Sequence, residues 1–198
     1  MPQPRNEERR RALADAAIAI LAGQGSHHLT HRTVDRRAGV PAGTTANYFP
    51  QRDDLLDAAA RRIVELSVTD MTTATAPTQT DPPSRPDLAG LLGDSLFAAA
   101  TVLRERYLAI YELLLEATRR PRLAETLATL SESTVESTLA LHRELGLGTT
   151  RAQVEAMVTL YGGALYALVT GPGAETITRD QTRALARAIV TGVLGAGD

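Results

Sequence analysis

Residues 29–50 constrain the fold more than any other stretch, because they specify two short helices joined by a tight turn. Thr30 predicts the start of the first helix, since its hydroxyl can accept a hydrogen bond from a free N–H of the first turn. Gly39 predicts its end, because a left-handed backbone costs glycine little. Pro41 suits the entry of the second helix, and Pro50 forbids its continuation. The pattern predicts a helix-turn-helix, whose second helix can enter the major groove of DNA.

The charge distribution agrees with this interpretation. Residues 1–62 carry ten arginines against seven acidic residues, whereas residues 63–198 carry eleven arginines against sixteen acidic residues. A basic N-terminal part on an acidic remainder would be attracted to phosphate. The asymmetry is small, so it supports the helix-turn-helix interpretation without carrying it.

The composition favours an all-helical protein. The chain is 43% hydrophobic but only 4% aromatic, and its apolar residues recur at helical spacing rather than alternating. It contains no cysteine, which excludes disulfides and thiolate metal sites. The sequence shows no secretory apolar segment and no apolar run near the ~18–20 residues of a membrane span. We therefore expect a cytoplasmic protein with no membrane partner.

Apolar spacing also predicts the other helices. Asp53 is expected to cap the long helix that follows the helix-turn-helix. Residues 73–86 have low complexity and four prolines, and predict a mobile surface loop. The expected helices span residues 6–22, 53–72, 87–103, 104–119, 121–145, 151–170 and 178–195.

Together these features, over about residues 7–60, resemble the TetR family of bacterial transcriptional regulators. The matches are Gly25, Leu29-Thr30, Thr33-Val34, Ala38-Gly39-Val40, Gly43-Thr44, Tyr48-Phe49 and Arg52-Asp53-Asp54-Leu55-Leu56. One position departs from the family pattern, since Asp35 stands where family members usually carry alanine. We expect a looser contact between the two short helices there.

The resemblance implies a DNA-binding domain over residues 1–52 and a helical ligand-binding and dimerisation domain over residues 53–198. Asn47 is the best candidate for reading a base, because its amide can bond adenine in a bidentate way. A solvated or capping role for Asn47, and packing within the domain for Tyr48, stay open. The residues that match DNA-contacting positions are Thr30, Arg32, Thr33, Ala42, Gly43, Thr44, Ala46, Asn47, Tyr48 and Arg52, with Tyr48 and Arg52 expected on phosphates.

The resemblance further implies a pocket for a small organic effector and a homodimer. Candidate pocket residues are Phe97, Tyr107, Tyr111, Leu114, Leu139, Met157 and Tyr161, although aromatic residues at helical spacing also occur in ordinary cores. The last two helices are apolar on more than one side, as expected of helices that face both a core and a partner. Candidate interface residues are Gly162, Gly163, Tyr166, Ile189, Val190 and Val193; a fully intramolecular core is the alternative.

An enzyme is the main rival class. His27, His28 and His31 lack the cysteines or acidic residues of a metal site, and no nucleophile–base pattern is present. We therefore expect no cofactor, no metal and no catalysis. The expected function is a ligand-responsive repressor that binds a near-palindromic, double-stranded DNA operator as a homodimer and is released by its effector. The alternatives are a ligand-independent DNA-binding regulator and a helical adaptor for another protein.

Overall fold

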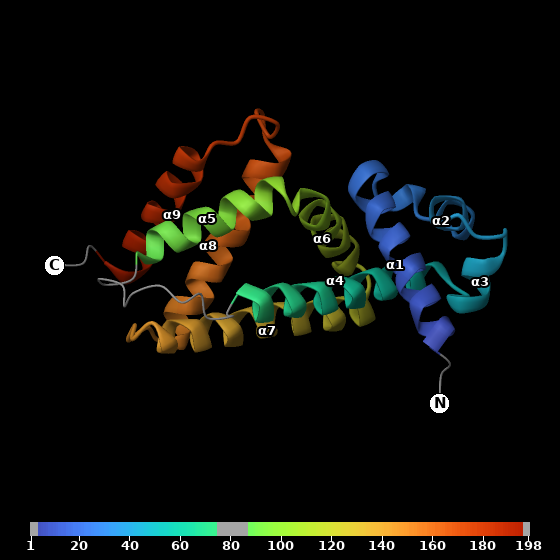
Figure 1. The fold of residues 1–198 in the computed structure, drawn as a ribbon, viewed down its shortest axis with the longest axis horizontal. Coiled ribbons are helices and arrows are strands. Elements are labelled where there is room, and N and C mark those ends of the chain that lie inside the picture. The colour runs from blue at the N-terminus through green and yellow to red at the C-terminus, as the bar shows by residue number, and fades with distance from the viewer. Residues whose placement is uncertain (1–3, 75–86, 196–198) are drawn as a thin grey trace. The chain divides into compact units, whose positions relative to one another are not determined.

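The computed structural model describes residues 4–74 and 87–195, and every regular element within those ranges is a helix (Figure 1). The expected all-helical class is confirmed. Residues 75–86, which make up most of the loop predicted over 73–86, lie outside the described residues. The elements are α1 (Pro4–Gln24), η1 (Ser26–His28), α2 (His31–Ala38), α3 (Thr44–Tyr48), α4 (Arg52–Ala74), α5 (Leu88–Thr101), α6 (Arg104–Ala117), α7 (Pro121–Glu144), α8 (Arg151–Thr170) and α9 (Arg179–Leu194).

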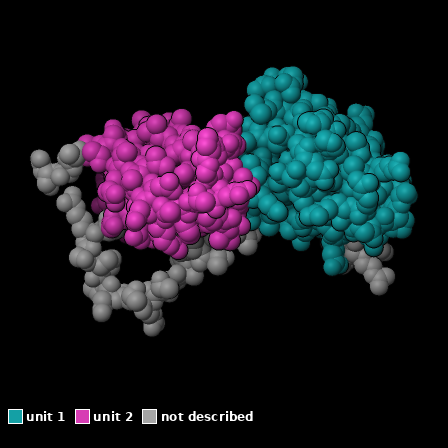
Figure 2. All heavy atoms as spheres, turned by 90° about the horizontal axis from the view of Figure 1, so that it is seen from above, with its two compact units in different colours: residues 1–69, 105–130 teal, residues 70–104, 131–198 magenta. Residues whose placement is uncertain are grey.

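The chain forms two compact units, coloured teal and magenta in Figure 2. Unit 1 comprises residues 1–69 and 105–130, so it holds α1, η1, α2 and α3 together with most of α4 and α6 and the start of α7. Unit 2 comprises residues 70–104 and 131–198, and holds α5, α8, α9 and the rest of α7. The functional division at residue 52 stays a prediction.

The core of unit 1 joins helices that are far apart in the sequence. Its side chains recur at the three- and four-residue spacing that places them on one face of each helix. Because α1, α4, α6 and α7 all contribute, the helix-turn-helix is packed on a scaffold and is not an isolated motif. The largest completely or almost completely buried members are Leu13, Ile20, Leu21, Leu29, Val34, Leu55, Leu56, Ile63 and Leu113.

The core of unit 2 is centred on α5, α8 and α9. Leu88, Met157 and Ile189 form its buried cluster. Gly93 of α5 lies so close to α9 that an added Cβ would stand 2.9 Å from Cα of Arg183. Only glycine permits this approach, because a Cβ at that distance overlaps backbone.

Threonine starts three of these helices with the same device. Thr30, Thr150 and Thr178 each form a capping box at the head of α2, α8 and α9. In this motif the side chain of the N-cap residue accepts a hydrogen bond from the backbone N–H of the residue three positions later. The side chain of that later residue accepts one from the N–H of the N-cap residue. The prediction that Asp53 caps α4 is wrong: α4 already begins at Arg52.

Among the described helices, α8 alone has the length and mean hydropathy that a membrane span requires. Its first turns carry the charged residues Arg151 and Glu155, and its Val154, Met157 and Leu165 are buried in unit 2. A single helix of this kind is common as a packed helix of a globular domain. It nevertheless comes closer to a membrane span than we expected from the sequence.

Candidate DNA-binding surface

The helices α2 and α3 form the predicted helix-turn-helix. Thr30 caps α2 as predicted, because its side chain accepts a 3.2 Å hydrogen bond from the backbone N–H of Thr33. Gly39 ends α2 with φ 65°, and Gly43 precedes α3 with φ 87°. Both values lie in the left-handed region that favours glycine. The local sequence therefore decides where α2 begins and ends, whereas α3 begins at Thr44, three residues after the Pro41 that was expected at its entry.

Asp35 forms the contact between the two helices, and our expectation of a looser contact there is wrong. Its side chain is 4% exposed and accepts hydrogen bonds from Gly43 N at 2.7 Å, Thr45 N at 2.7 Å and Thr45 Oγ1 at 2.5 Å. Burial by itself would raise the pKa of Asp35. The hydrogen bonds from Thr45 and Gly43, with His31 nearby, outweigh burial and hold the pKa below its ordinary value of 3.8.

The outward face of α3 carries the expected base-reading residues. Thr45 is completely buried, whereas Ala46 and Asn47, which follow it in the helix, are exposed to solvent. Ala42 and Gly43, which precede the helix, are exposed as well. The half-buried Thr44 donates its hydroxyl to the carbonyl of Pro41 at 2.6 Å. This face offers one amide side chain, that of Asn47, among small ones.

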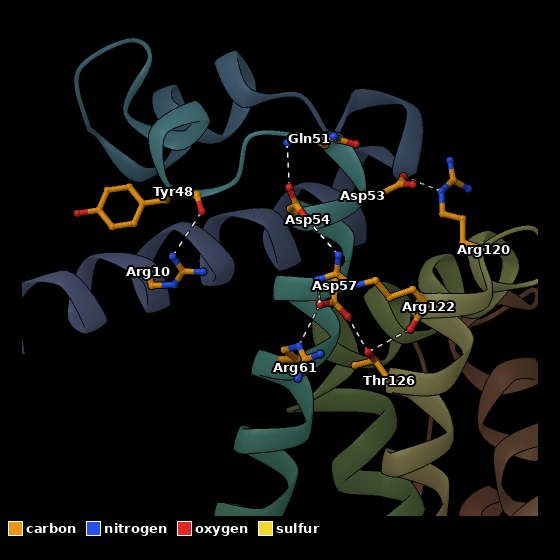
Figure 3. A network of polar contacts seen from close by, with 10 residues as sticks. All are labelled: Arg10, Tyr48, Gln51, Asp53, Asp54, Asp57, Arg61, Arg120, Arg122 and Thr126. Atoms are coloured by element: carbon orange, nitrogen blue, oxygen red, sulfur yellow. Dashed lines mark hydrogen bonds and ion pairs between the residues drawn. The ribbon is translucent and has the colours of Figure 1, made fainter. Parts of the chain in front are cut away.

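Tyr48 and Phe49 at the end of α3 are held by an arginine of α1. Arg10 Nη1 donates to the carbonyl of Tyr48 at 3.4 Å, and its guanidinium lies 4.8 Å from the ring centroid of Phe49. The half-buried Tyr48 packs on the core of unit 1, while its ring points away from α1 and α4 (Figure 3). Tyr48 therefore packs partly on the core while its phenol points outward, and its contact with phosphate stays a prediction. Sequence reasoning missed the role of Arg10.

His31 makes a second link between the two short helices. Its Nε2 lies 2.6 Å from the carbonyl oxygen of Phe49, so Nε2 carries the proton in this hydrogen bond. The start of α2 is thereby joined to the end of α3. No local pattern indicates this pairing, because the two residues are eighteen positions apart.

The residues expected to grip phosphate divide into exposed and engaged groups. Arg32 is exposed. Thr33 Oγ1 donates to His28 O at 2.7 Å, and the hydroxyl of Thr30 serves the cap of α2. Arg52 points inward, where Nη2 donates to Ser26 O at 2.6 Å, so a phosphate would have to replace that partner.

The 3₁₀ turn η1 is held by two carboxylates of α6. Ser26 N donates to Glu112 Oε2 at 2.9 Å, and Ser26 Oγ donates to Glu116 Oε1 at 2.6 Å. Glu116 also binds Arg120, and Arg52 and Arg119 lie near it. Burial alone would raise the pKa of Glu116, but the Ser26 hydrogen bond and these arginines keep it below the ordinary value. No local pattern links these glutamates to Ser26, because they lie 86 and 90 positions away from it in the sequence.

A second buried carboxylate joins α4 to α7. Asp57 is 5% exposed and accepts from Thr126 Oγ1 at 2.6 Å, Arg61 Nε at 3.0 Å and Arg122 Nη2 at 3.2 Å (Figure 3). An open groove of about 640 Å³ runs beside this network, and none of the predicted pocket residues line it. Its lining residues are Arg61, Val64, Glu65, Arg122, Glu125, Thr126 and Thr129.

The predicted pocket residues fall in both units. Tyr107, Tyr111 and Leu114 lie on α6 in unit 1, and Phe97, Leu139, Met157 and Tyr161 lie in unit 2. Met157 is buried in the core of unit 2, and Arg179 covers the ring of Phe97 with its guanidinium 4.4 Å from the centroid. The Tyr161 hydroxyl lies 3.0 Å from Ser95 Oγ. That these residues surround one ligand stays a prediction.

The predicted interface residues also divide. Gly163 and Tyr166 of α8 are exposed, and a Cβ at Gly162 or Gly163 would meet nothing within 4 Å. Ile189 of α9, in contrast, is 7% exposed and belongs to the core of unit 2, because its side chain faces Leu88 and Met157. Val190 and Val193 pack at the edge of the same core. Leu160 of α8 and Leu185 of α9 are also exposed, at 48% and 37%.

An exposed recognition helix, held in a helix-turn-helix on an all-helical chain, defines a helix-turn-helix transcriptional regulator. The sequence model described as Tetracyclin repressor-like, C-terminal domain, matches residues 83–196, which is more than half of the chain. The chain therefore belongs to the TetR family, as its N-terminal residues predicted. It is accordingly a DNA-binding regulator of a family whose members respond to ligands.

Individual relatives agree with this assignment. The crystal structure of the multidrug binding protein EbrR complexed with ethidium is 31% identical, covers 91% of this chain and 98% of that chain, and has a TM-score of 0.65. A transcriptional regulator from Rhodococcus sp. Rha1 has a TM-score of 0.72 at 17% identity, covering 96% and 99% of the two chains, and shows the shared fold. The HTH-type transcriptional regulator BetI of Escherichia coli (strain K12 / DH10B) is 40% identical over 55 residues, which is 28% of each chain.

Proposed function

We propose that this protein is a repressor that binds a near-palindromic operator as a homodimer and is released by a small organic effector. The exposed face of α3 is the observation that supports operator binding. Asn47 and Ala46 stand outward there, while Asp35, Arg10 and His31 hold the helix from behind. Rigid support of this kind is what base recognition requires, because a displaced helix loses its hydrogen bonds to base edges.

The organisation of α6 supports the effector half. The helix carries Tyr107 and Tyr111, which are predicted to contact the effector, and Glu112 and Glu116, which hold Ser26 of η1. A ligand that shifts α6 would thus pull on the turn just before α2. If the effector binds the two arrangements with affinities that differ by ~1–3 kcal/mol, it would lower the affinity for the operator about five- to 150-fold.

A planar aromatic effector is the best first candidate. EbrR, a relative at 31% identity, has been crystallised with ethidium and with proflavin. Tyrosine rings can stack on such molecules and attract their positive charge. The candidate is testable with the free protein, which avoids the intercalation of these dyes into DNA.

The homodimer is supported by the outer face of α8. Ala156, Leu160, Gly163 and Ala167 are exposed along this face at helical spacing. Apolar side chains on one exposed stripe favour association with a second helix surface. One helix-turn-helix reads a single half-site, so a two-fold dimer is needed to read a near-palindrome. A cytoplasmic location follows from this role.

Selection of genomic fragments by the purified protein tests the proposal. We expect enrichment of one near-palindromic sequence, bound by a dimer in sedimentation analysis. Gly163→Glu is expected to give a folded monomer with weak operator binding, since a side chain at this position has open space within its own chain. No enrichment over random fragments would reject the DNA half. Unchanged operator affinity across many organic compounds would reject the effector half alone.

A further inference from the structure

The recognition helix α3 lacks a capping side chain of its own. It covers only Thr44–Tyr48, and its N-cap is Gly43, which makes no side-chain hydrogen bond. The neighbouring α2 starts with the capping box of Thr30 instead. A five-residue helix without tertiary support is unstable in water, because too few hydrogen bonds repay its nucleation. The position of α3 must therefore be set from outside the helix.

One carboxylate of α2 performs both halves of a capping box for α3. Asp35 Oδ1 accepts the N–H of Thr45, as an N-cap side chain would do. Asp35 Oδ2 accepts the N–H of the N-cap residue itself, Gly43. In an ordinary capping box this bond is made by the side chain three positions after the N-cap. Both N···O distances are 2.7 Å. The two oxygens thus hold the backbone N–H groups on either side of Thr44 at the start of α3.

Thr45 adds a third bond that fixes the rotation of the helix. Its Oγ1 donates to Asp35 Oδ1 at 2.5 Å, and the side chain is completely buried. Residues 46 and 47 follow directly and face outward. Because successive residues are about 100° apart around a helix, any turn of Thr45 away from Asp35 turns Asn47 away from the outward face by the same angle.

We propose that Asp35 and Thr45 form a buried pair that positions the recognition helix and thereby determines how sharply this regulator distinguishes its operator from other DNA. This inference rests on the proposed function, since it concerns the same DNA-binding face. Asp35 is buried and acts through its bonds to Gly43 and Thr45, so it is a positioning residue. Its departure from the family's usual alanine is compensated by Thr45, which supplies a donor for the carboxylate.

The test uses Asp35→Asn, Thr45→Val and Thr45→Ser, with Thr126→Val as a matched control. The control removes an equivalent bond, from Thr126 Oγ1 to Asp57 Oδ1 at 2.6 Å, which joins α4 to α7 rather than α2 to α3. Each full-length variant is titrated with the selected operator and with a scrambled duplex of equal length. The ratio of the two dissociation constants is compared with the midpoint of thermal unfolding.

Asp35→Asn and Thr45→Val are expected to lower the ratio about tenfold, the scale of one lost base contact, with scrambled-duplex affinity unchanged. Thr45→Ser keeps the hydroxyl and should restore the ratio. Thr126→Val should lower the unfolding midpoint while leaving the ratio intact. Equal ratios for Thr45→Val and the wild type, or an equal fall for Thr126→Val, would overturn the inference. A wild-type protein that prefers no duplex would instead reject the proposed function.

Discussion

The hydroxyl of Ser26 donates a 2.6 Å hydrogen bond to Oε1 of Glu116, ninety residues further along the chain. The side chain of Glu116 is only 10% exposed, and its other oxygen binds the guanidinium of Arg120. The bond joins the turn before the helix-turn-helix to α6, which carries three of the candidate effector contacts. The bond thus links α6 to η1, the turn just before α2.

Breaking this bond should destabilise the protein measurably. We expect Ser26→Ala and Glu116→Gln each to lower the free energy of unfolding by about 1–2 kcal/mol, because each disturbs a buried hydrogen bond to a charged group. Urea denaturation followed by circular dichroism measures both. The double variant should lose less than the sum of the two single losses, since the residues share one interaction. Strict additivity would show that they act independently.

Replacement of Arg10 should weaken DNA binding indirectly, because Arg10 supports the end of α3 rather than contacting a base. Arg10→Ala removes the guanidinium from Phe49 and from the carbonyl of Tyr48, at a cost of about 0.5–1 kcal/mol in unfolding free energy. Operator affinity should fall more than for Arg9→Ala, its exposed neighbour on α1. Equal losses for the two variants, with equal changes in salt dependence, would show that Arg10 acts only through its charge.

Replacement of Asn47 and replacement of Tyr48 should have different effects on sequence preference. Asn47→Ala is expected to cost roughly 1–3 kcal/mol at one base position and to relax the preference there. Tyr48→Phe should weaken binding to all duplexes alike, since a phenol on phosphate carries no sequence information. Binding of each variant to a library of single-base operator changes measures both. Equal losses for Asn47→Ala on operator and random DNA would remove its role in base reading.

Acid should destabilise the protein through its buried carboxylates. The pKa values of Asp35, Asp57 and Glu116 are all held below their ordinary values of 3.8, 3.8 and 4.5. Groups of this kind stabilise the folded state above the unfolded-state pKa, and that contribution is lost as the pH falls through the folded-state pKa. We therefore expect stability to fall steeply below about pH 4. Asp57→Asn should make the free energy of unfolding depend less steeply on pH below about pH 4. An unchanged slope would show that Asp57 does not contribute to the acid sensitivity.

A buried histidine should add pH dependence at milder acidity. His142 is 2% exposed, and burial lowers its pKa below the ordinary value of 6.5. The unfolded chain then binds the proton more readily, so stability should decrease as the pH falls below 6.5. His142→Gln should flatten this part of the curve. Thr149→Val removes the 2.8 Å partner of Nδ1 but keeps the titrating ring, so the slope should remain.

Local chemistry made the helix boundaries and the family predictable. Thr30 caps α2, Gly39 ends it in a left-handed conformation, and α3 stops before Pro50. Each of these signals acts over four residues or fewer, because a cap or a breaker affects only the nearest backbone groups. Helical spacing likewise indicated the buried faces of α1 and α4.

Tertiary structure decided which polar residues support the DNA-binding face. From sequence alone Asp35 indicated a loose contact and Arg52 a phosphate contact, and no local pattern linked Glu116 to Ser26. In the fold Asp35 accepts three hydrogen bonds, and Arg52 and Glu116 meet at Ser26. The physical reason is that a buried charge is tolerable only where donors from distant segments converge on it. That convergence is a property of the assembled helices and leaves no periodic trace in the chain.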